Sequence, residues 1–402
     1  MRFYDALATL RSGDTSSFEN LVKCANAATD EDLAMLADCL GRSGATLAFG
    51  NSVDVASTGG PTSLSTLLPP LAIAAMGCQV RALAVPGRPA GGIDVMGTIP
   101  GYRVHLDPSE VSAVIKRSCY VHFLADRHYA PLDIALFRYR QNHAAQAVAP
   151  LAIASLVAKK VAAGVGRACL DVRVAQHGNL GRTWPEARNN AERFVRVADL
   201  LGIRATCWLT DARFPYQPWI GRGETLVALD YVLSGQADGS LQDHAQLCNR
   251  MAAATVGAIV SDIPSPSRLR ETLERHLEAQ GASWSAFQTR VEATRQAERH
   301  IIRVQREGTL RVDLALIRDL LVRVQADFHE SGRDFCDPAG IVLLCETGRR
   351  VSEGQEVALV RAPSAVMDAL VADLAPAFYL GRTAEDLEQR EPELLSSNSA
   401  QS

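Results

Sequence analysis

The chain of 402 residues contains very little lysine. Only four of its 41 basic residues are lysines, namely Lys23, Lys116, Lys159 and Lys160, and all the others are arginines. The two side chains are not interchangeable at a specific site, because lysine presents a compact charge and arginine a planar fork of donors. A lysine retained in such a chain is therefore a candidate functional residue.

The sequence also lacks the patterns of several protein classes. Its nine cysteines never form Cys-x-x-Cys, which indicates reduced thiols in a cytoplasm, and its nine histidines show no metal-ligand spacing. Apolar runs are interrupted before they could span a membrane, and the net charge of −4 comes without a basic stripe. We therefore expect a cytoplasmic globular protein of two or three domains, with no metal and no nucleic-acid or membrane partner.

A stretch of small and hydroxyl residues precedes an apolar helix near residue 60. Residues 54–66 read Asp-Val-Ala-Ser-Thr-Gly-Gly-Pro-Thr-Ser-Leu-Ser-Thr, and residues 67–77 predict a buried helix ended by glycine. Paired glycines let the backbone approach a ligand, and a helix N-terminus favours an anion. A serine-rich turn before a capped helix is an equally good interpretation of this stretch alone. The candidate phosphate-binding residues are Ser57, Thr58, Gly59, Gly60, Ser65 and Thr66.

Short apolar strands alternate with helices over most of the chain, which favours an α/β layer with parallel pairing. The strand candidates are 78–86, 120–124, 168–174 and 205–211. Residues 1–47 and 132–164 instead read as helices, residues 338–361 read as strands and turns, and the polar tail from about 386 has the composition of a disordered segment.

Residues 150–164 predict an alanine-rich helix that carries two of the four lysines. Pro150 lies where this helix can begin, and Gly164 lies just past its end. Ser155 and Lys159 are four residues apart and share a face. Lys160 points elsewhere, and we expect it to be a solvated end of the helix.

These segments, in this order, resemble the thymidine and pyrimidine-nucleoside phosphorylases, which share a fold with anthranilate phosphoribosyltransferase. The resemblance covers about residues 30–365. The matching segments are Ser-Thr-Gly-Gly at 57–60, Gly87 and Arg88 with Gly91 and Gly92, Ile-Pro-Gly at 99–101, Arg140, Pro150 through Lys160, Leu-Asp-Val at 170–172, Leu-Thr-Asp at 209–211, Ile220 with Gly221, and residues 338–343.

The resemblance implies an α/β protein of three parts. A small all-helical domain faces a large mixed or parallel-sheet α/β domain across a cleft, and a C-terminal α+β domain resembles a barrel sandwich. A homodimer is also expected, but not from the resemblance alone, because the N-terminal helical region is shorter than the family's and lacks a helix that usually helps to form the dimer. The expected boundaries are 1–47 with 132–162 for the helical domain, 48–131 with 163–310 for the α/β domain, 311–385 for the C-terminal domain and 386–402 for the disordered tail.

The family's reaction is attack by inorganic phosphate on the anomeric carbon of a pyrimidine nucleoside, with the base leaving as an anion. Such a site needs cationic or hydrogen-bonding groups where that charge develops. The resemblance assigns this task to Arg140, Ser155 and Lys159, and it places Phe137 against the base. Arg88 is a further candidate substrate-binding residue. No cofactor is expected; phosphate or a sugar phosphate would be the co-substrate.

The phosphate half departs from the family pattern. The family has a lysine and a histidine immediately before Ser-Thr-Gly-Gly, where this chain has Val55 and Ala56. Pro86 and Ile93 also replace expected hydroxyl residues. A phosphate held without a nearby cation binds weakly, so Arg81 or Arg88 is a candidate replacement.

Three functions are compatible with these residues. We favour a pyrimidine-nucleoside phosphorylase-like pentosyltransferase, which cleaves or forms an N-glycosidic bond to a pyrimidine-type base and has an altered nucleophile site. The alternatives are a nucleoside hydrolase, for which Asp54 is the one candidate base in the 54–66 stretch, and a non-catalytic nucleobase- or nucleoside-binding protein. A phosphoribosyltransferase is disfavoured, because the segment after Asp171 lacks an acidic pair for magnesium.

Overall fold

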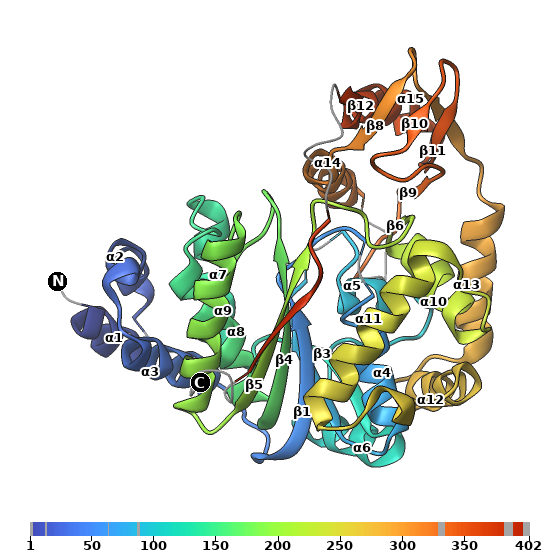
Figure 1. The fold of residues 1–402 in the computed structure, drawn as a ribbon. Helices are drawn as coiled ribbons and strands as arrows, with labels where there is room; N and C mark the ends of the chain where they lie inside the picture. Colours follow the sequence, from blue (N-terminus) through green and yellow to red (C-terminus); the bar gives the residue numbers. More distant parts are fainter. Residues whose placement is uncertain are drawn as a thin grey trace.

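The structure is a computed structural model that describes residues 3–12, 14–62, 64–86, 89–328, 334–381 and 389–396. Helices cover both faces of a central sheet, the first helices lie at one side, and the C-terminal sheets lie at the far upper corner (Figure 1). No helix in these described ranges combines the length and apolarity needed to cross a bilayer.

The central sheet has the strand order β13-β5-β4-β1-β2-β3. Its five neighbouring parallel strands are β1 (Gly50–Ser57), β2 (Val80–Ala84), β3 (Tyr120–Leu124), β4 (Val165–Val174) and β5 (Arg204–Asp211). They are largely buried, as apolar runs in a parallel sheet covered on both faces require. Each predicted strand is present, with its bounds shifted by a few residues at most.

The sixth strand corrects one prediction. The polar tail was expected to be disordered from residue 386, but β13 (Glu393–Ser396) pairs antiparallel with β5. Leu395 of this strand is buried in the core beside β5. Local composition indicates polarity here but does not report the long-range pairing that orders these four residues.

One face of the sheet packs against the N-terminal half of the molecule. Leu33 of α3 and Leu151 of α8 belong to one buried cluster with Leu170 of β4. A capping box between Thr29 and Asp32 begins α3. The helices of this side are α1 (Phe3–Arg11), α2 (Phe18–Cys24), α3 (Asp30–Gly41), α7 (Pro131–Asn142), α8 (Ala149–Ala162) and α9 (Trp184–Asp199).

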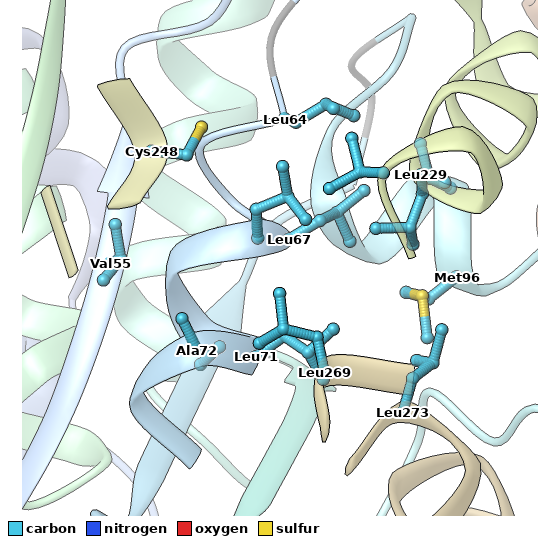
Figure 2. Packing of buried hydrophobic residues seen from close by; sticks show 14 of the residues in the cluster. Val55, Leu64, Leu67, Leu71, Ala72, Met96, Leu229, Cys248, Leu269 and Leu273 are labelled. Atoms are coloured by element: carbon cyan, nitrogen blue, oxygen red, sulfur yellow. The ribbon is translucent and has the colours of Figure 1, made fainter. Parts of the chain in front are cut away.

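The opposite face carries a second core. Figure 2 shows Leu67, Leu71, Met96 and Leu229 on one side of Val55 of β1, and all five residues belong to one buried cluster. Leu64 and Leu67, which precede α4, belong to this cluster, so the cluster holds the loop in place. The helices of this side are α4 (Leu68–Ala75), α5 (Gly92–Met96), α6 (Pro108–Ser118), α10 (Arg222–Leu233), α11 (Gly239–Val256), α12 (Pro266–Ala279) and α13 (Trp284–Gln296).

The C-terminal region contains two small antiparallel sheets, ordered β10-β8-β12 and β6-β9-β11-β7. Strand β6 (Trp219–Gly221) comes from the middle of the chain and joins this region to the rest. The other elements are β7 (His300–Arg303), β8 (Gly308–Val312), α14 (Leu314–Asp327), β9 (Gly340–Leu343), β10 (Arg350–Val351), β11 (Glu356–Arg361), α15 (Ser364–Leu374) and β12 (Phe378–Gly381). The domain boundaries given above stay predictions.

A buried ion network fastens β11 to α10. Arg361 donates to both carboxylate oxygens of Glu224, from Nε and Nη2 at 2.8 Å each, and also donates to Asp337. These carboxylates raise the pKa of Arg361 against the opposing effect of burial. A bidentate pair of this kind adds geometric specificity to charge.

We expect Arg361→Met to lower the free energy of unfolding by about 3 kcal/mol, because it leaves two carboxylates buried with less compensation. The loss stays at the low end of the usual range because Arg290 and Arg299 also reach these carboxylates. Chemical denaturation measures the change. The matched control is Arg303→Met, whose partner Glu356 is half-exposed, and it should cost less than about 1 kcal/mol. Equal losses would contradict the role given to the network.

Candidate functional site

A cavity of about 130 Å³ lies at the carboxyl ends of β1 and β2, facing α7 and α8. Ligands of open α/β sheets bind at this edge. The volume suits one six-membered ring, since a cavity of about 150 Å³ takes up benzene. Seven of the candidate site residues line it, namely Ser57, Thr58, Thr66, Phe137, Arg140, Ser155 and Lys159.

Three of the other candidates do not line the cavity. Gly59, Gly60 and Ser65 are not among the residues that line the cavity. Arg88 lies outside the described residues. Arg81 is near the amino end of β2, where its Nη1 donates to Ala48 O at 2.8 Å. Arg81 is therefore not the cation that replaces the missing lysine.

Lys159 is held on the α8 side of the cavity by three hydrogen bonds. Its Nζ donates to Asp133 Oδ2 at 2.6 Å, and to Ser155 O and Ser155 Oγ at 2.9 Å each. Burial lowers the pKa of Lys159, and the Asp133 carboxylate opposes that shift. Because Ser155 Oγ accepts from the lysine, its own proton is left to donate to a ligand.

Arg140 is fixed by the turn between α7 and α8. Its Nε donates to Ala145 O at 3.2 Å and its Nη2 donates to Gln146 O at 2.7 Å. Only 3% of the residue is exposed, and burial lowers the pKa of Arg140 to about 10. The guanidinium therefore stays charged at neutral pH. Arg140, Ser155 and Lys159 thus place a guanidinium, a hydroxyl and an ammonium on one wall, with Phe137 beside them.

Lys160 corrects a further prediction. Only 2% of it is exposed, and its Nζ pairs with the Asp54 carboxylate on β1, so it is not a solvated end. The helical period shows that Lys160 points away from Lys159, but it does not show that β1 covers that side. Lys160 and Asp54 both line the cavity on its β1 side. Val55 and Ala56 form its apolar wall there.

A second buried network holds the Ser-Thr-Gly-Gly loop. Ser65 Oγ donates to Asp171 Oδ2 at 2.6 Å, and Arg173 Nε donates to the same oxygen at 2.9 Å. Arg173 also donates to Gly60 O at 3.1 Å. A Cβ at Gly60 would lie 2.9 Å from Arg173 Nη1, and its φ of +139° favours glycine. Ser65 and Gly60 therefore fix the shape of the loop without lining the cavity.

Arg173 and His122 are not among the site residues predicted from the sequence. Asp171 and Arg173 are two residues apart in a buried strand, so they share a face, and charges at such positions are a usable signal. His122 lies within the apolar strand β3 and lines the cavity. No local motif marks it.

His244 of α11 anchors the same loop. Leu64 N donates to His244 Nε2 at 2.8 Å, so Nε2 must be unprotonated, and the Tyr216 ring stacks on the imidazole at 5.0 Å. Burial lowers the pKa of His244 to about 3. Protonation would remove the acceptor and release the loop.

We expect His244 to make stability depend on pH. The unfolded chain takes up a proton near pH 6.5 and the folded one only near pH 3, so its contribution to stability is lost as pH falls between these values. The slope is up to about 1.4 kcal/mol per pH unit. Denaturation of wild type and His244→Gln between pH 7 and pH 4 should show a shallower decline for the variant. The matched control is His300→Gln on β7, where the histidine is exposed. Parallel curves for wild type and His244→Gln would contradict the assignment.

Comparisons with known proteins agree with this fold and site. No protein-family model matches the chain. The anthranilate phosphoribosyltransferase of Thermus thermophilus superposes with a TM-score of 0.52 and 15% identity, covering 73% of this chain and 94% of that one. The molecule therefore has the phosphoribosyltransferase-like fold, a helical part beside an α/β part, which confirms the predicted fold class.

Curated relatives show which proteins the chain resembles. The thymidine phosphorylase of Burkholderia orbicola is 26% identical over 365 residues, covering 84% of this chain and 80% of the relative. The human thymidine phosphorylase is 26% identical, with 81% and 72% covered. The Sinorhizobium medicae thymidine phosphorylase is 28% identical over 64% of this chain, which spans 60% of that relative's length. These matches confirm the resemblance to the thymidine phosphorylase family.

Proposed function

We propose that the protein is a pyrimidine-nucleoside phosphorylase-like pentosyltransferase acting on a pyrimidine-type base. One observation carries the proposal: Phe137, Arg140, Ser155 and Lys159 line one small cavity together with hydroxyls of the Ser-Thr-Gly-Gly segment. The similarity to thymidine phosphorylases over most of the chain supports it.

The charges of the wall match the chemistry that the proposal requires. When the glycosidic bond breaks, its electron pair leaves with the base, so negative charge grows on the base. Arg140 and the Lys159 ammonium are fixed positive charges on buried side chains, where electrostatic stabilisation is strongest. Asp133 holds the ammonium next to Ser155 before any substrate arrives. Because all three protons of that ammonium are donated within the protein, Lys159 acts as a fixed positive charge, while Ser155 Oγ keeps its own proton to donate.

In the same proposal, the phosphate-binding half of the site differs from that of the family. Val55 and Ala56 supply no charge, and Lys160 is already paired with Asp54. A weaker hold on phosphate is the expected consequence. The homodimer and the cytoplasmic location stay predictions from the resemblance and the composition.

We expect Arg140→Met and Lys159→Met each to weaken uracil and thymine binding by about tenfold to a hundredfold, the effect of losing a charged hydrogen bond. Methionine keeps most of the buried volume, and thermal unfolding checks the fold. Isothermal titration calorimetry measures the affinity. The matched control is Lys116→Met, at an exposed lysine of α6, which should bind as wild type does. Unchanged affinity in either site variant would refute the assignment of the base.

Release of free base from uridine, thymidine and deoxyuridine, followed by chromatography with and without inorganic phosphate, tests the reaction. We expect release that depends on phosphate. Release that is independent of phosphate would favour a nucleoside hydrolase, and base binding without release from any of the three would favour a non-catalytic binding protein.

A further inference from the structure

We propose that His122 binds the acceptor, by donating a hydrogen bond from Nε2 to an acceptor oxygen in the half of the cavity opposite the base wall. The acceptor class is an oxyanion, for which inorganic phosphate is the probe. This inference rests on the proposed function, because it assigns the base to the α7 and α8 wall.

His122 and the Thr66 hydroxyl lie at one corner of the cavity. Only 3% of His122 is exposed, and its ring lines the cavity together with Thr66 and Gly92. A Cβ built on Gly92 would lie 2.7 Å from His122 Cε1 and 3.0 Å from Thr66 Oγ1. The absence of a side chain at Gly92 therefore lets the start of α5 pack directly against the imidazole and against Thr66.

The neighbours of the ring determine which nitrogen carries the proton. Tyr120 Oη lies 3.3 Å from His122 Nδ1, and burial raises the pKa of Tyr120, so the phenol keeps its proton. Within the described ranges that proton has no other acceptor than Nδ1. Nδ1 therefore accepts, and the ring proton lies on Nε2. Because Nδ1 faces Tyr120, the Nε2 edge is the one that remains for the cavity.

His122 is a neutral donor. Burial, with smaller effects from His276 and Lys160, lowers the pKa of His122 to about 3. Nε2 has no hydrogen-bond partner among the residues that the structure describes. A neutral N–H can bind an oxyanion without adding a second cation beside Lys160.

The ring is held by a buried network behind it. Gln280 clamps the backbone of His122 from both sides, accepting from its N–H at 3.2 Å and donating to its carbonyl oxygen. His276 stacks on Tyr120 at 4.1 Å, and its Nδ1 donates to Tyr120 O at 3.1 Å. The Tyr102 hydroxyl donates to His276 Nε2 at 2.8 Å. The network satisfies its own polar groups and leaves His122 Nε2 for a ligand.

The described residues beside this corner supply no unpaired cation for phosphate. Val55 and Ala56 are apolar, and Lys160 Nζ is paired with Asp54. The uncharged side-chain donors that line the cavity include His122 and the hydroxyls of Ser57, Thr58 and Thr66. His122 keeps its proton throughout, so its part is to bind and orient the acceptor while the base departs with the electron pair.

Calorimetry of uracil binding, and of phosphate binding with and without uracil, tests the inference on wild type, His122→Leu and His122→Gln. We expect His122→Leu to weaken phosphate binding by about tenfold or more and to leave uracil binding within about twofold. His122→Gln should keep most of the phosphate affinity, because its amide nitrogen restores a donor near the place of Nε2.

Gly92→Ala is a second variant that leaves His122 intact. Its methyl group would collide with His122 Cε1 and with the Thr66 carbonyl oxygen and displace both, so we expect weaker phosphate binding with uracil binding unchanged. The inference is wrong if His122→Leu binds phosphate as wild type does, if it loses uracil and phosphate equally, or if wild type binds uracil but no phosphate. A wild type that binds phosphate but no pyrimidine base would instead contradict the proposed function, and phosphate binding without uracil would still report on His122.

Discussion

A charge removed from water must meet an opposite charge, and α8 satisfies this requirement twice. Lys159 and Lys160 are consecutive, so they point about 100° apart around the helix and find partners on different elements. Lys159 pairs with Asp133 of α7, and Lys160 pairs with Asp54 of β1. One helix thereby fixes α7 and the end of β1 relative to each other. Because the cavity lies between those elements, its shape depends on both ion pairs.

The sequence predicts what local pattern controls. Apolar runs mark the parallel strands, Pro150 and Gly164 bracket α8, and seven candidate residues line the cavity. Long-range packing accounts for the rest. The helical period separates Lys160 from Lys159 but cannot show that a strand 106 positions away in sequence supplies its carboxylate. His122 is similar, since a histidine in an apolar strand becomes meaningful only when the chain brings it beside Thr66.

Under the proposed function, the two ends of the cavity meet different electrostatic demands. At the base end, fixed cationic donors await a charge that grows only as the bond breaks, and such interactions lower the barrier. At the acceptor end, the charge is present before the reaction starts. Tighter binding of that ground state would not by itself accelerate the chemical step. The loss of a cation at residue 55 therefore reduces affinity for the acceptor more than it reduces the maximal rate.

The terminal strand β13 has a consequence for association between chains. It pairs with β5 from Thr206 to Leu209, and Glu393 accepts a hydrogen bond from Trp184 Nε1 at 3.1 Å. Without it, β5 would be an open edge whose unpaired N–H and C=O groups could recruit a strand from another molecule. Residues 393–396 thus cover this edge of the sheet and keep it from pairing with another chain. A chain shortened before residue 389 would keep its cavity but expose a surface suited to aggregation.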